Sequence, residues 1–242
     1  MAKRTSHGVA NPSSALFIGN SFFYYNNGVN HHLNQMLLTE NPKFKWRQVL
    51  AAISGAGLDW HDVESYFRPN ALSSFSFDPD NNIVFNTFDR LFDLAIMMDG
   101  SQSPIHPALI KSSIDFARKH CETARKHGAT PIIFETWAYA DKPDMTAPLA
   151  EAYARMGAEN DVMVIPAGQA FARSLAARPD IGLHAPDKRH PSLAGTYLSA
   201  CLIYECIFAK SPVGLAYVAE LPRDIATHLQ QVAHEMLVAH HT

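Results

Sequence analysis

The sequence predicts an α/β fold, a three-layer α/β/α sandwich with a central parallel five-stranded sheet. Short apolar runs alternate along the 242 residues with longer stretches of helical periodicity, as in strand–helix–strand units. The connections are long enough for right-handed crossover helices, which favours parallel strands covered on both faces. No repeat, low-complexity segment or long polar linker divides the chain, so we expect one domain over residues 1–242.

The first half of the chain contains two predicted strands and a segment without clear periodicity. Residues 1–13 are polar and are expected to be flexible. Residues 68–89 hold two prolines, several Asn and Ser and scattered aromatics, and are expected to form an insertion. The regular elements expected here are a strand at 15–18, a helix at 29–39, a strand at 46–53 and a short helix at 58–66.

The second half alternates more regularly between the two kinds of element. The elements expected here are strands at 94–98, 131–134 and 162–165, and helices at 106–127, 145–156, 193–208 and 222–240. In a parallel sheet of this type, ligands bind beyond the carboxyl ends of the strands. Residues that directly follow a predicted strand are therefore the first candidates for a functional site.

Composition and charge exclude several classes of function. The net charge is −3 and the Lys and Arg residues are scattered, so nucleic acid is not an expected partner. The first 14 residues lack an apolar signal core, and no apolar run approaches the roughly 18 residues that span a bilayer. We expect a cytoplasmic protein without a membrane span. The three cysteines lie in helical segments and are interpreted as buried reduced thiols.

The first candidate site residue is Ser21, in the turn Gly19-Asn20-Ser21 directly after the first predicted strand. A hydroxyl there would be held at the carboxyl end of the strand, near the start of a helix, where a nucleophile is expected. The alternative is that Ser21 only caps the helix, because Ser is a favoured N-cap residue.

A second candidate is the pair Asp187 and His190, which precedes a predicted helix. Two intervening residues allow one tight loop to present both side chains. The carboxylate can then bind one imidazole nitrogen and leave the other to accept a proton from a serine. The alternative is that Asp187 is a surface turn residue and that His190 or Ser192 caps the helix.

Two further turns follow predicted strands and could supply an oxyanion site. Gly55 lies in a flexible loop after the second strand, and Gln102 follows Gly100 after the third. A backbone N–H at a glycine and a side-chain carboxamide are both suitable donors for the oxygen of a tetrahedral intermediate. Either glycine could instead be a simple turn residue.

Together these elements resemble the SGNH, or GDSL-like, hydrolases over nearly the full chain. Gly19-Asn20-Ser21-Phe22 resembles the first family block with Asn for the usual Asp. Gly55 resembles the glycine of the second block, and Asp187-Lys188-Arg189-His190 resembles the Asp-x-x-His of the last. The stretch from His190-Pro191-Ser192 through Gly195-Thr196-Tyr197-Leu198 is similar to a bacterial subgroup whose sequences begin with a comparable Gly-Asn-Ser turn. The third block departs from the family, because Gly100-Ser101-Gln102-Ser103 replaces the usual Gly-x-Asn-Asp. Gln102 keeps the carboxamide but is one methylene longer.

The resemblance implies the flavodoxin-like SGNH fold and a serine esterase that acts through an acyl-enzyme, with no metal or cofactor. Ser21 would be the nucleophile, His190 the base and Asp187 its orienting acid; Ser21, Gly55 and Gln102 would form the oxyanion hole. The implied substrates are short-chain acyl esters or carbohydrate O-acetyl esters. We expect activity to rise with pH as the imidazole becomes neutral.

The aromatic residues near the site have two interpretations. Phe22, beside the nucleophile, and Trp137, after the fourth strand, could line a pocket for sugars or short acyl chains. They could equally pack a helix onto the sheet. The sequence does not indicate an oligomeric state.

Three other classes of function share some of these features. A lipase-type α/β-hydrolase needs Gly-x-Ser-x-Gly well inside the chain, whereas Phe23 holds the last glycine position here. A metallohydrolase is suggested by 13 His residues, but there is no His-Glu-x-x-His and no Cys-x-x-Cys. The third alternative is a catalytically silent SGNH-fold module that binds a glycan or acyl group, which covalent labelling of Ser21 by a fluorophosphonate would distinguish from an esterase.

Overall fold

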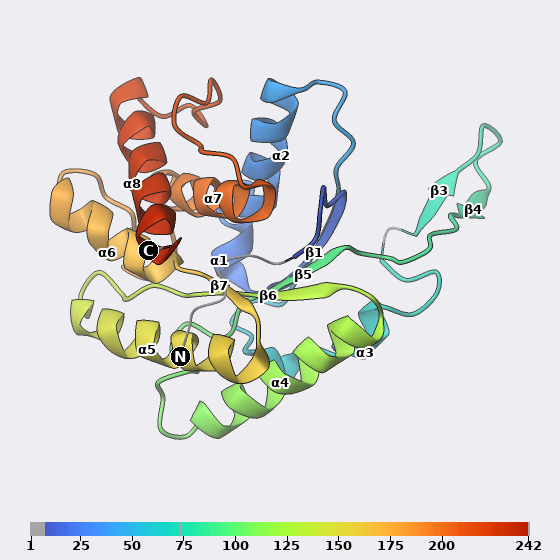
Figure 1. Ribbon diagram of the computed structural model, residues 1–242, viewed down its shortest axis with the longest axis horizontal. Helices are drawn as coiled ribbons and strands as arrows, with labels where there is room; N and C mark the ends of the chain where they lie inside the picture. Colours follow the sequence, from blue (N-terminus) through green and yellow to red (C-terminus); the bar gives the residue numbers. More distant parts are fainter. Residues whose placement is uncertain (1–7, 73, 242) are drawn as a thin grey trace.

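The computed structural model describes residues 8–72 and 74–241 and contains the predicted five-stranded parallel sheet (Figure 1). The strand order is β2-β1-β5-β6-β7, and each neighbouring pair is parallel. The strands are β1 (Ser14–Gly19), β2 (Arg47–Ala52), β5 (Leu94–Met97), β6 (Thr130–Phe134) and β7 (Met163–Ile165). The predicted α/β/α fold class is confirmed.

The strands form where the sequence is continuously apolar because both faces of the sheet are covered. Leu16, Phe17 and Ile18 of β1 have no exposed surface, and β5 is buried along its whole length. A parallel strand covered on both faces cannot alternate polar and apolar residues without burying unpaired polar groups. β2 lies at one edge of the sheet, and each of its residues is only half-buried.

Helices cover both faces of the sheet (Figure 1). One layer contains α2 (Val29–Glu40), α7 (Leu193–Phe208) and α8 (Arg223–His241), with α6 (Ala167–Ala177) packed against α7 and α8. The other layer contains α3 (Val63–Tyr66), α4 (Ile110–Lys126) and α5 (Thr146–Asn160). α7 is buried almost all round, because it lies between the sheet and both α2 and α8. The cysteines are free thiols, of which Cys121 and Cys201 are buried.

Some predicted helices differ from the structure. The expected helix at 58–66 is wrong, because the chain there forms a 3-10 turn, η1 (Leu58–Trp60), and then α3. His61 separates them in an extended conformation and donates from Nε2 to the Gly19 carbonyl at 3.0 Å, which draws it toward the end of β1. The helix expected from residue 106 begins at Ile110.

One helix was missing from the sequence interpretation. α6 follows Pro166 and buries Ala170, Phe171 and Ser174, a spacing of one helical turn. Pro166 immediately before this periodic segment was the available signal, since proline is common at helix starts.

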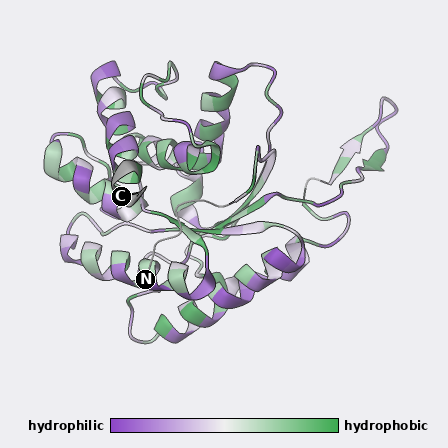
Figure 2. Cartoon of the chain, viewed as in Figure 1, coloured by the Kyte–Doolittle hydropathy of each residue, from purple (hydrophilic) through white to green (hydrophobic). Residues whose placement is uncertain are grey.

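The expected insertion at 68–89 contains a β-hairpin that projects from the body (Figures 1 and 2). Its strands are β3 (Phe75–Phe77) and β4 (Ile83–Phe85), which pair antiparallel and form a sheet of their own. We refer to residues 74–89 as the arm. Figure 2 shows hydrophobic residues along the arm and hydrophilic residues at its tip.

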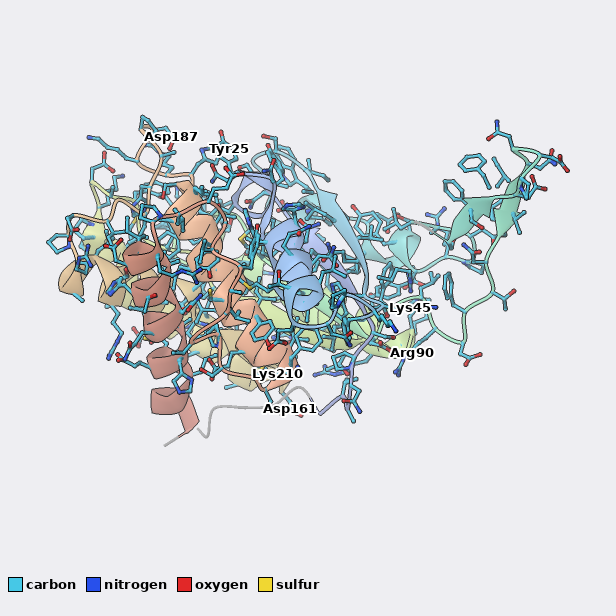
Figure 3. All side chains as sticks on the ribbon, turned by 90° about the horizontal axis from the view of Figure 1, so that it is seen from above. Tyr25, Lys45, Arg90, Asp161, Asp187 and Lys210 are labelled. Carbon is cyan, nitrogen blue, oxygen red and sulfur yellow. The ribbon has the colours of Figure 1, made fainter. Side chains whose placement is uncertain are left out.

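The two ends of the sheet carry different features. Figure 3 places Asp187 and Tyr25 at one edge of the molecule and Lys45 and Arg90 at the opposite edge, where β2 and β5 begin. Of the segment 1–13 that was expected to be flexible, residues 1–7 lie outside the described part, and Ser13 N–H donates to Asp93 Oδ2 at 2.7 Å. Among the described helices, none combines the length and the apolarity needed to cross a bilayer.

Candidate active site

The turn after β1 presents Ser21 at the carboxyl end of the sheet. Asn20 caps the short helix α1 (Ser21–Tyr24), and its side-chain oxygen accepts from Phe22 N–H at 3.1 Å. Ser21 is therefore the first helical residue, and the interpretation of Ser21 as the N-cap is wrong. A Cβ at Gly19 would lie 2.9 Å from the Phe23 ring, so glycine permits this close approach of turn and side chain.

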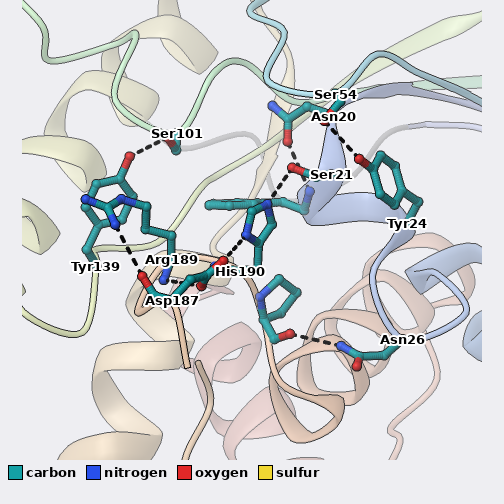
Figure 4. Close-up of polar contacts among 12 residues, drawn as sticks. Asn20, Ser21, Tyr24, Asn26, Ser54, Ser101, Tyr139, Asp187, Arg189 and His190 are labelled. Atoms are coloured by element: carbon teal, nitrogen blue, oxygen red, sulfur yellow. Dashed lines mark hydrogen bonds and ion pairs between the residues drawn. The ribbon is translucent and has the colours of Figure 1, made fainter. Parts of the chain in front are cut away.

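The loop before α7 brings His190 to Ser21, although the two are 169 residues apart in the sequence (Figure 4). His190 Nε2 lies 2.8 Å from Ser21 Oγ, and His190 Nδ1 is hydrogen-bonded to Asp187 Oδ2. Asp187 Oδ1 accepts from the backbone N–H groups of Arg189 at 2.9 Å and His190 at 3.0 Å. Serine, imidazole and carboxylate thus lie in one continuous hydrogen-bonded line.

The loop is tight enough to require one left-handed residue. Lys188 has φ of 66°, and its N–H donates to the Ala185 carbonyl at 2.9 Å. The loop is closed by a bridge between His184 and Pro191, and Ser192 caps α7 by accepting from Gly195 N–H at 3.2 Å. Of the two residues considered as helix caps, His190 and Ser192, the cap is Ser192.

The charge of Asp187 determines which imidazole nitrogen carries the proton. The hydrogen bond from His190, supported by the Arg189 N–H, lowers the pKa of Asp187 to about 2. An ionised carboxylate only accepts hydrogen bonds, so Nδ1 donates to it and Nε2 is left with a free lone pair. This is the tautomer that can accept the Ser21 proton.

Two aromatic rings hold the imidazole in this position. The Tyr25 ring stacks on His190 with centroids 4.0 Å apart and an interplanar angle of 6°. Phe22 meets the same ring edge-on at 5.6 Å. The contact with Tyr25 was not predicted, because a stacking partner that comes from another loop leaves no pattern in the sequence.

The two residues expected to bind substrate lie in the packing beneath the site. Trp137 has no exposed surface and is sandwiched between Phe22 and Phe171, with centroids at 4.4 Å and 4.3 Å. Phe22 is 4% exposed. The indole N–H of Trp137 donates to the Arg189 carbonyl at 2.9 Å, which ties this stack to the histidine loop. In this conformation both side chains support the loop and form no open wall.

Two buried polar residues join the three loops that follow β1, β2 and β5. Asn20 Nδ2 donates to the carbonyls of Ala56 at 2.9 Å and Asp99 at 3.1 Å. Asp99 Oδ1 accepts from the N–H groups of Leu58 at 2.9 Å and Gly100 at 2.7 Å. Burial raises the pKa of Asp99, which is 2% exposed. Sequence reasoning missed Asp99; its position directly after a predicted strand was the available signal.

Gly55 lies beside the nucleophile turn. The hydroxyl group of its neighbour Ser54 accepts a hydrogen bond from the Tyr24 hydroxyl group at 3.1 Å. The carbonyl of its other neighbour, Ala56, accepts from Asn20. Gly55 has φ of 73°, and a Cβ there would meet no atom within 4 Å. The backbone conformation thus favours glycine, and the space beside it is open.

Gln102 lies in the loop after β5, on the other side of β1 from Gly55. Its backbone carbonyl accepts from His106 N–H at 2.9 Å, while its half-buried side-chain amide makes no hydrogen bond within the described residues. Next to it, Ser101 Oγ lies 2.7 Å from the Tyr139 hydroxyl, and the Arg189 guanidinium stacks over the Tyr139 ring at 4.9 Å (Figure 4). Within the described residues, no group of three or more His, Cys, Asp or Glu is arranged to hold a metal ion.

Comparisons with known proteins find similarity at the level of structure. No family model and no curated protein sequence matches the chain. A DUF4886 family protein from Bacteroides uniformis is 18% identical with a TM-score of 0.67, over 93% of this chain and 94% of that chain. A protein proposed to be an SGNH hydrolase, from Slackia heliotrinireducens, is 23% identical with a TM-score of 0.60, over 81% and 99% of the two chains.

The acetylxylan esterase Axe2 from Geobacillus stearothermophilus is also similar. A catalytic mutant of Axe2 with a serine replaced by alanine is 14% identical with a TM-score of 0.57, over 82% of this chain and 96% of that chain. A second catalytic mutant of Axe2 has a histidine replaced by alanine. Identities this low show a shared three-layer fold.

Proposed function

We propose that this chain, which has the SGNH hydrolase fold, is a serine esterase that hydrolyses carboxylic esters with Ser21 as nucleophile. The observation that carries the proposal is the 2.8 Å contact between Ser21 Oγ and His190 Nε2, with Asp187 on the opposite nitrogen of the same ring. A serine hydroxyl is a weak nucleophile until an adjacent base removes its proton. This arrangement provides that base in the required tautomer.

The reaction follows from these three side chains. As Ser21 Oγ attacks the ester carbonyl carbon, its proton passes to His190 Nε2 and the carbonyl electron pair moves onto the oxygen. The tetrahedral intermediate collapses, the alcohol leaves with the proton from His190, and the acyl group stays on Ser21. Water then repeats the sequence with His190 as base and releases the acid. Asp187 stabilises the imidazolium in both steps.

The developing oxyanion needs hydrogen-bond donors. We assign this role to the backbone N–H groups of Ser21 and Gly55 and to the side chain of Gln102. The open space at Gly55 and the unpaired amide of Gln102 support the assignment. One such donor typically contributes about 3–4 kcal/mol of transition-state stabilisation.

The substrates proposed are short-chain acyl esters or O-acetyl esters of carbohydrates. The fold shared with an acetylxylan esterase supports the second class. The catalytic mutants of that esterase at a serine and a histidine support the roles assigned to Ser21 and His190.

The test is hydrolysis of p-nitrophenyl acyl esters and acetylated sugars by wild type and Ser21→Ala. The wild type should be active and should be labelled at Ser21 by a fluorophosphonate. Ser21→Ala should lose both properties, and Ser76→Ala, at an exposed serine of β3, should keep them. A wild-type protein that is folded but neither labelled nor active would indicate the silent binding module. A preference for sugar acetates would identify the substrate class.

A further inference from the structure

The arm carries an apolar face that no other part of the described chain covers. In the hairpin Phe75 pairs with Phe85 and Phe77 with Ile83, so these four side chains share one face. They are 44%, 56%, 60% and 58% exposed, respectively. An isolated two-stranded hairpin is only marginally stable in water. Both the exposure and the isolation leave this face available to another surface.

The tip of the arm is acidic. The tip contains Asp78 and Asp80, and residues 74–89 contain no Lys or Arg. The third carboxylate of the arm, Asp89, lies at its base. Asp78 is used inside the turn, where Oδ1 accepts from the N–H groups of Asp80 at 3.0 Å and Asn82 at 2.8 Å. The carboxylate of Asp80 makes no hydrogen bond within the described chain and is free to meet a cation.

A cavity of about 760 Å³ opens at the base of the arm. Its lining combines the aromatic rings of Phe44, Trp46 and Phe88 with three cationic side chains and two carboxylates, which are Lys45, Arg47, Arg90, Asp89 and Asp93. Figure 3 shows Lys45 and Arg90 near one another, on the edge of the body opposite Asp187. The cavity is therefore separate from the site at Ser21.

Three cations and two carboxylates line the cavity, and this net positive charge of one favours an acidic occupant. Asp93 is already paired, since it accepts from Ser13 and forms an ion pair with Arg90 at 2.6 Å. The Arg47 guanidinium stacks on Phe88 at 4.3 Å, and its buried Nη1 has no hydrogen-bond partner within the described residues. Lys45 is exposed. Cationic groups with spare donors, set among aromatic rings, match a segment that is both apolar and acidic.

We propose that this chain forms a two-fold dimer in which the arm of each copy inserts into the basic, aromatic cavity of the other. The arm extends away from its own body, so its tip cannot reach the cavity beside its own base (Figure 1). A second copy presents the same cavity, and a two-fold axis satisfies both arms at once. The acidic tip disfavours an anionic membrane surface as the occupant.

The available area fits a reciprocal exchange. Four half-exposed side chains of this size present roughly 400 Å² of apolar surface. A stable interface buries about 800 Å² on each partner. One arm alone falls short of that area, and an exchange in which each copy contributes both an arm and a cavity increases it.

The experiment is sedimentation of the full chain over a range of micromolar concentrations. Wild type should be a dimer, and the double variant Phe77→Ser, Ile83→Ser should be a monomer with unchanged circular dichroism. Val213→Ser, at an apolar side chain that is 45% exposed in another loop, should remain a dimer. Asp80→Lys and Lys45→Glu should each weaken the dimer at least tenfold, and their combination should restore it.

A monomeric wild type would overturn the proposal, as would a dimer that the arm substitutions leave intact. A monomer that binds anionic lipid vesicles through the arm would assign the surface to a membrane and would also overturn it. The Phe77→Ser, Ile83→Ser variant could abolish the dimer while Asp80→Lys combined with Lys45→Glu fails to restore it. That result would overturn the arm-to-cavity contact. None of these outcomes depends on esterase activity, so the two proposals fail separately.

Discussion

The Tyr25 ring lies parallel to the His190 ring, with centroids 4.0 Å apart and 6° between their planes. Tyr25 follows α1 directly, so the segment that carries Ser21 also supports the face of the imidazole. This contact fixes the ring while leaving Nε2 directed at Ser21 Oγ. Several consequences of the site geometry can be measured.

Removal of the stacked ring should impair turnover. Aromatic pairs contribute about 0.5–1.5 kcal/mol, so Tyr25→Ala should lower kcat about 2- to 10-fold. Tyr25→Phe keeps the ring and should stay close to wild type. The measurement is kcat and KM on a p-nitrophenyl ester. Equal losses in both variants would mean that the hydroxyl, and not the stack, matters.

Removal of the orienting charge should have a much larger effect. In Asp187→Asn the amide oxygen stays on the backbone N–H groups of Arg189 and His190, so the NH2 group faces Nδ1 and favours the wrong imidazole tautomer. The same substitution in serine proteases lowers kcat about 10⁴-fold. The control is Asp141→Asn, which loses only the ion pair with Lys188 at 3.6 Å. Because the pKa of Asp187 is lowered to about 2, its carboxylate stays ionised throughout the assay range. If activity falls as the pH is lowered toward about 4, protonation of Asp187 should therefore not be the cause. Full activity of Asp187→Asn would remove it from the mechanism.

The oxyanion assignment can be tested at the loop after β5. If the Gln102 amide donates to the oxyanion, Gln102→Ala should lower kcat about 10²-fold or more and change KM little, because the contact forms only in the transition state. Ser101→Ala, which loses only the contact with the Tyr139 hydroxyl, serves as the neighbouring control. Unchanged kcat in Gln102→Ala would leave the backbone donors alone in this role.

Asp99 should act as a positioning residue for the same loops. Asp99→Ala leaves the buried N–H groups of Leu58 and Gly100 unpaired, which costs about 1–3 kcal/mol each. Asp99→Asn keeps an acceptor for both and can donate to Ser113, so it should restore most of the stability and of kcat. Urea unfolding and kcat together test this. Similar damage from both substitutions would mean that the negative charge itself is required.

Buried histidines should make the fold sensitive to acid. Burial lowers the pKa of His61 and of His120 below the ordinary value of 6.5. The unfolded chain therefore binds more protons than the folded one just below pH 6.5, so stability is full above that pH and falls as the pH drops toward the folded-state pKa values.

The free energy of urea unfolding, measured between about pH 7 and about pH 5, tests this linkage. His120→Gln should show a smaller pH slope than wild type, by up to about 1.4 kcal/mol per pH unit. His106→Gln, at an exposed histidine, should show the wild-type slope. Equal slopes in all three proteins would exclude His120 as a source of the acid sensitivity.

The fold class, the five strands and most helices could be predicted from the sequence because the signals are local. A strand covered on both faces must be continuously apolar, as in β1, and α7 begins at Leu193 and ends at Phe208, as predicted. Local spacing also led to the pair Asp187 and His190, whose two intervening residues form one tight loop. By contrast, the helix expected at 58–66 failed, because a contact with the distant Gly19 carbonyl holds His61 extended.

What the sequence alone determined is therefore the set of chemical groups and the strands that carry them. Only the tertiary structure decided which groups meet: it brings Ser21 within 2.8 Å of His190, encloses Trp137 between two rings and joins three loops through Asp99. Among residues 8–72 and 74–241, it also leaves the apolar face of the arm exposed. The physical reason is that apolar periodicity and turn chemistry act over a few residues, whereas distance and burial depend on the order of strands in the sheet.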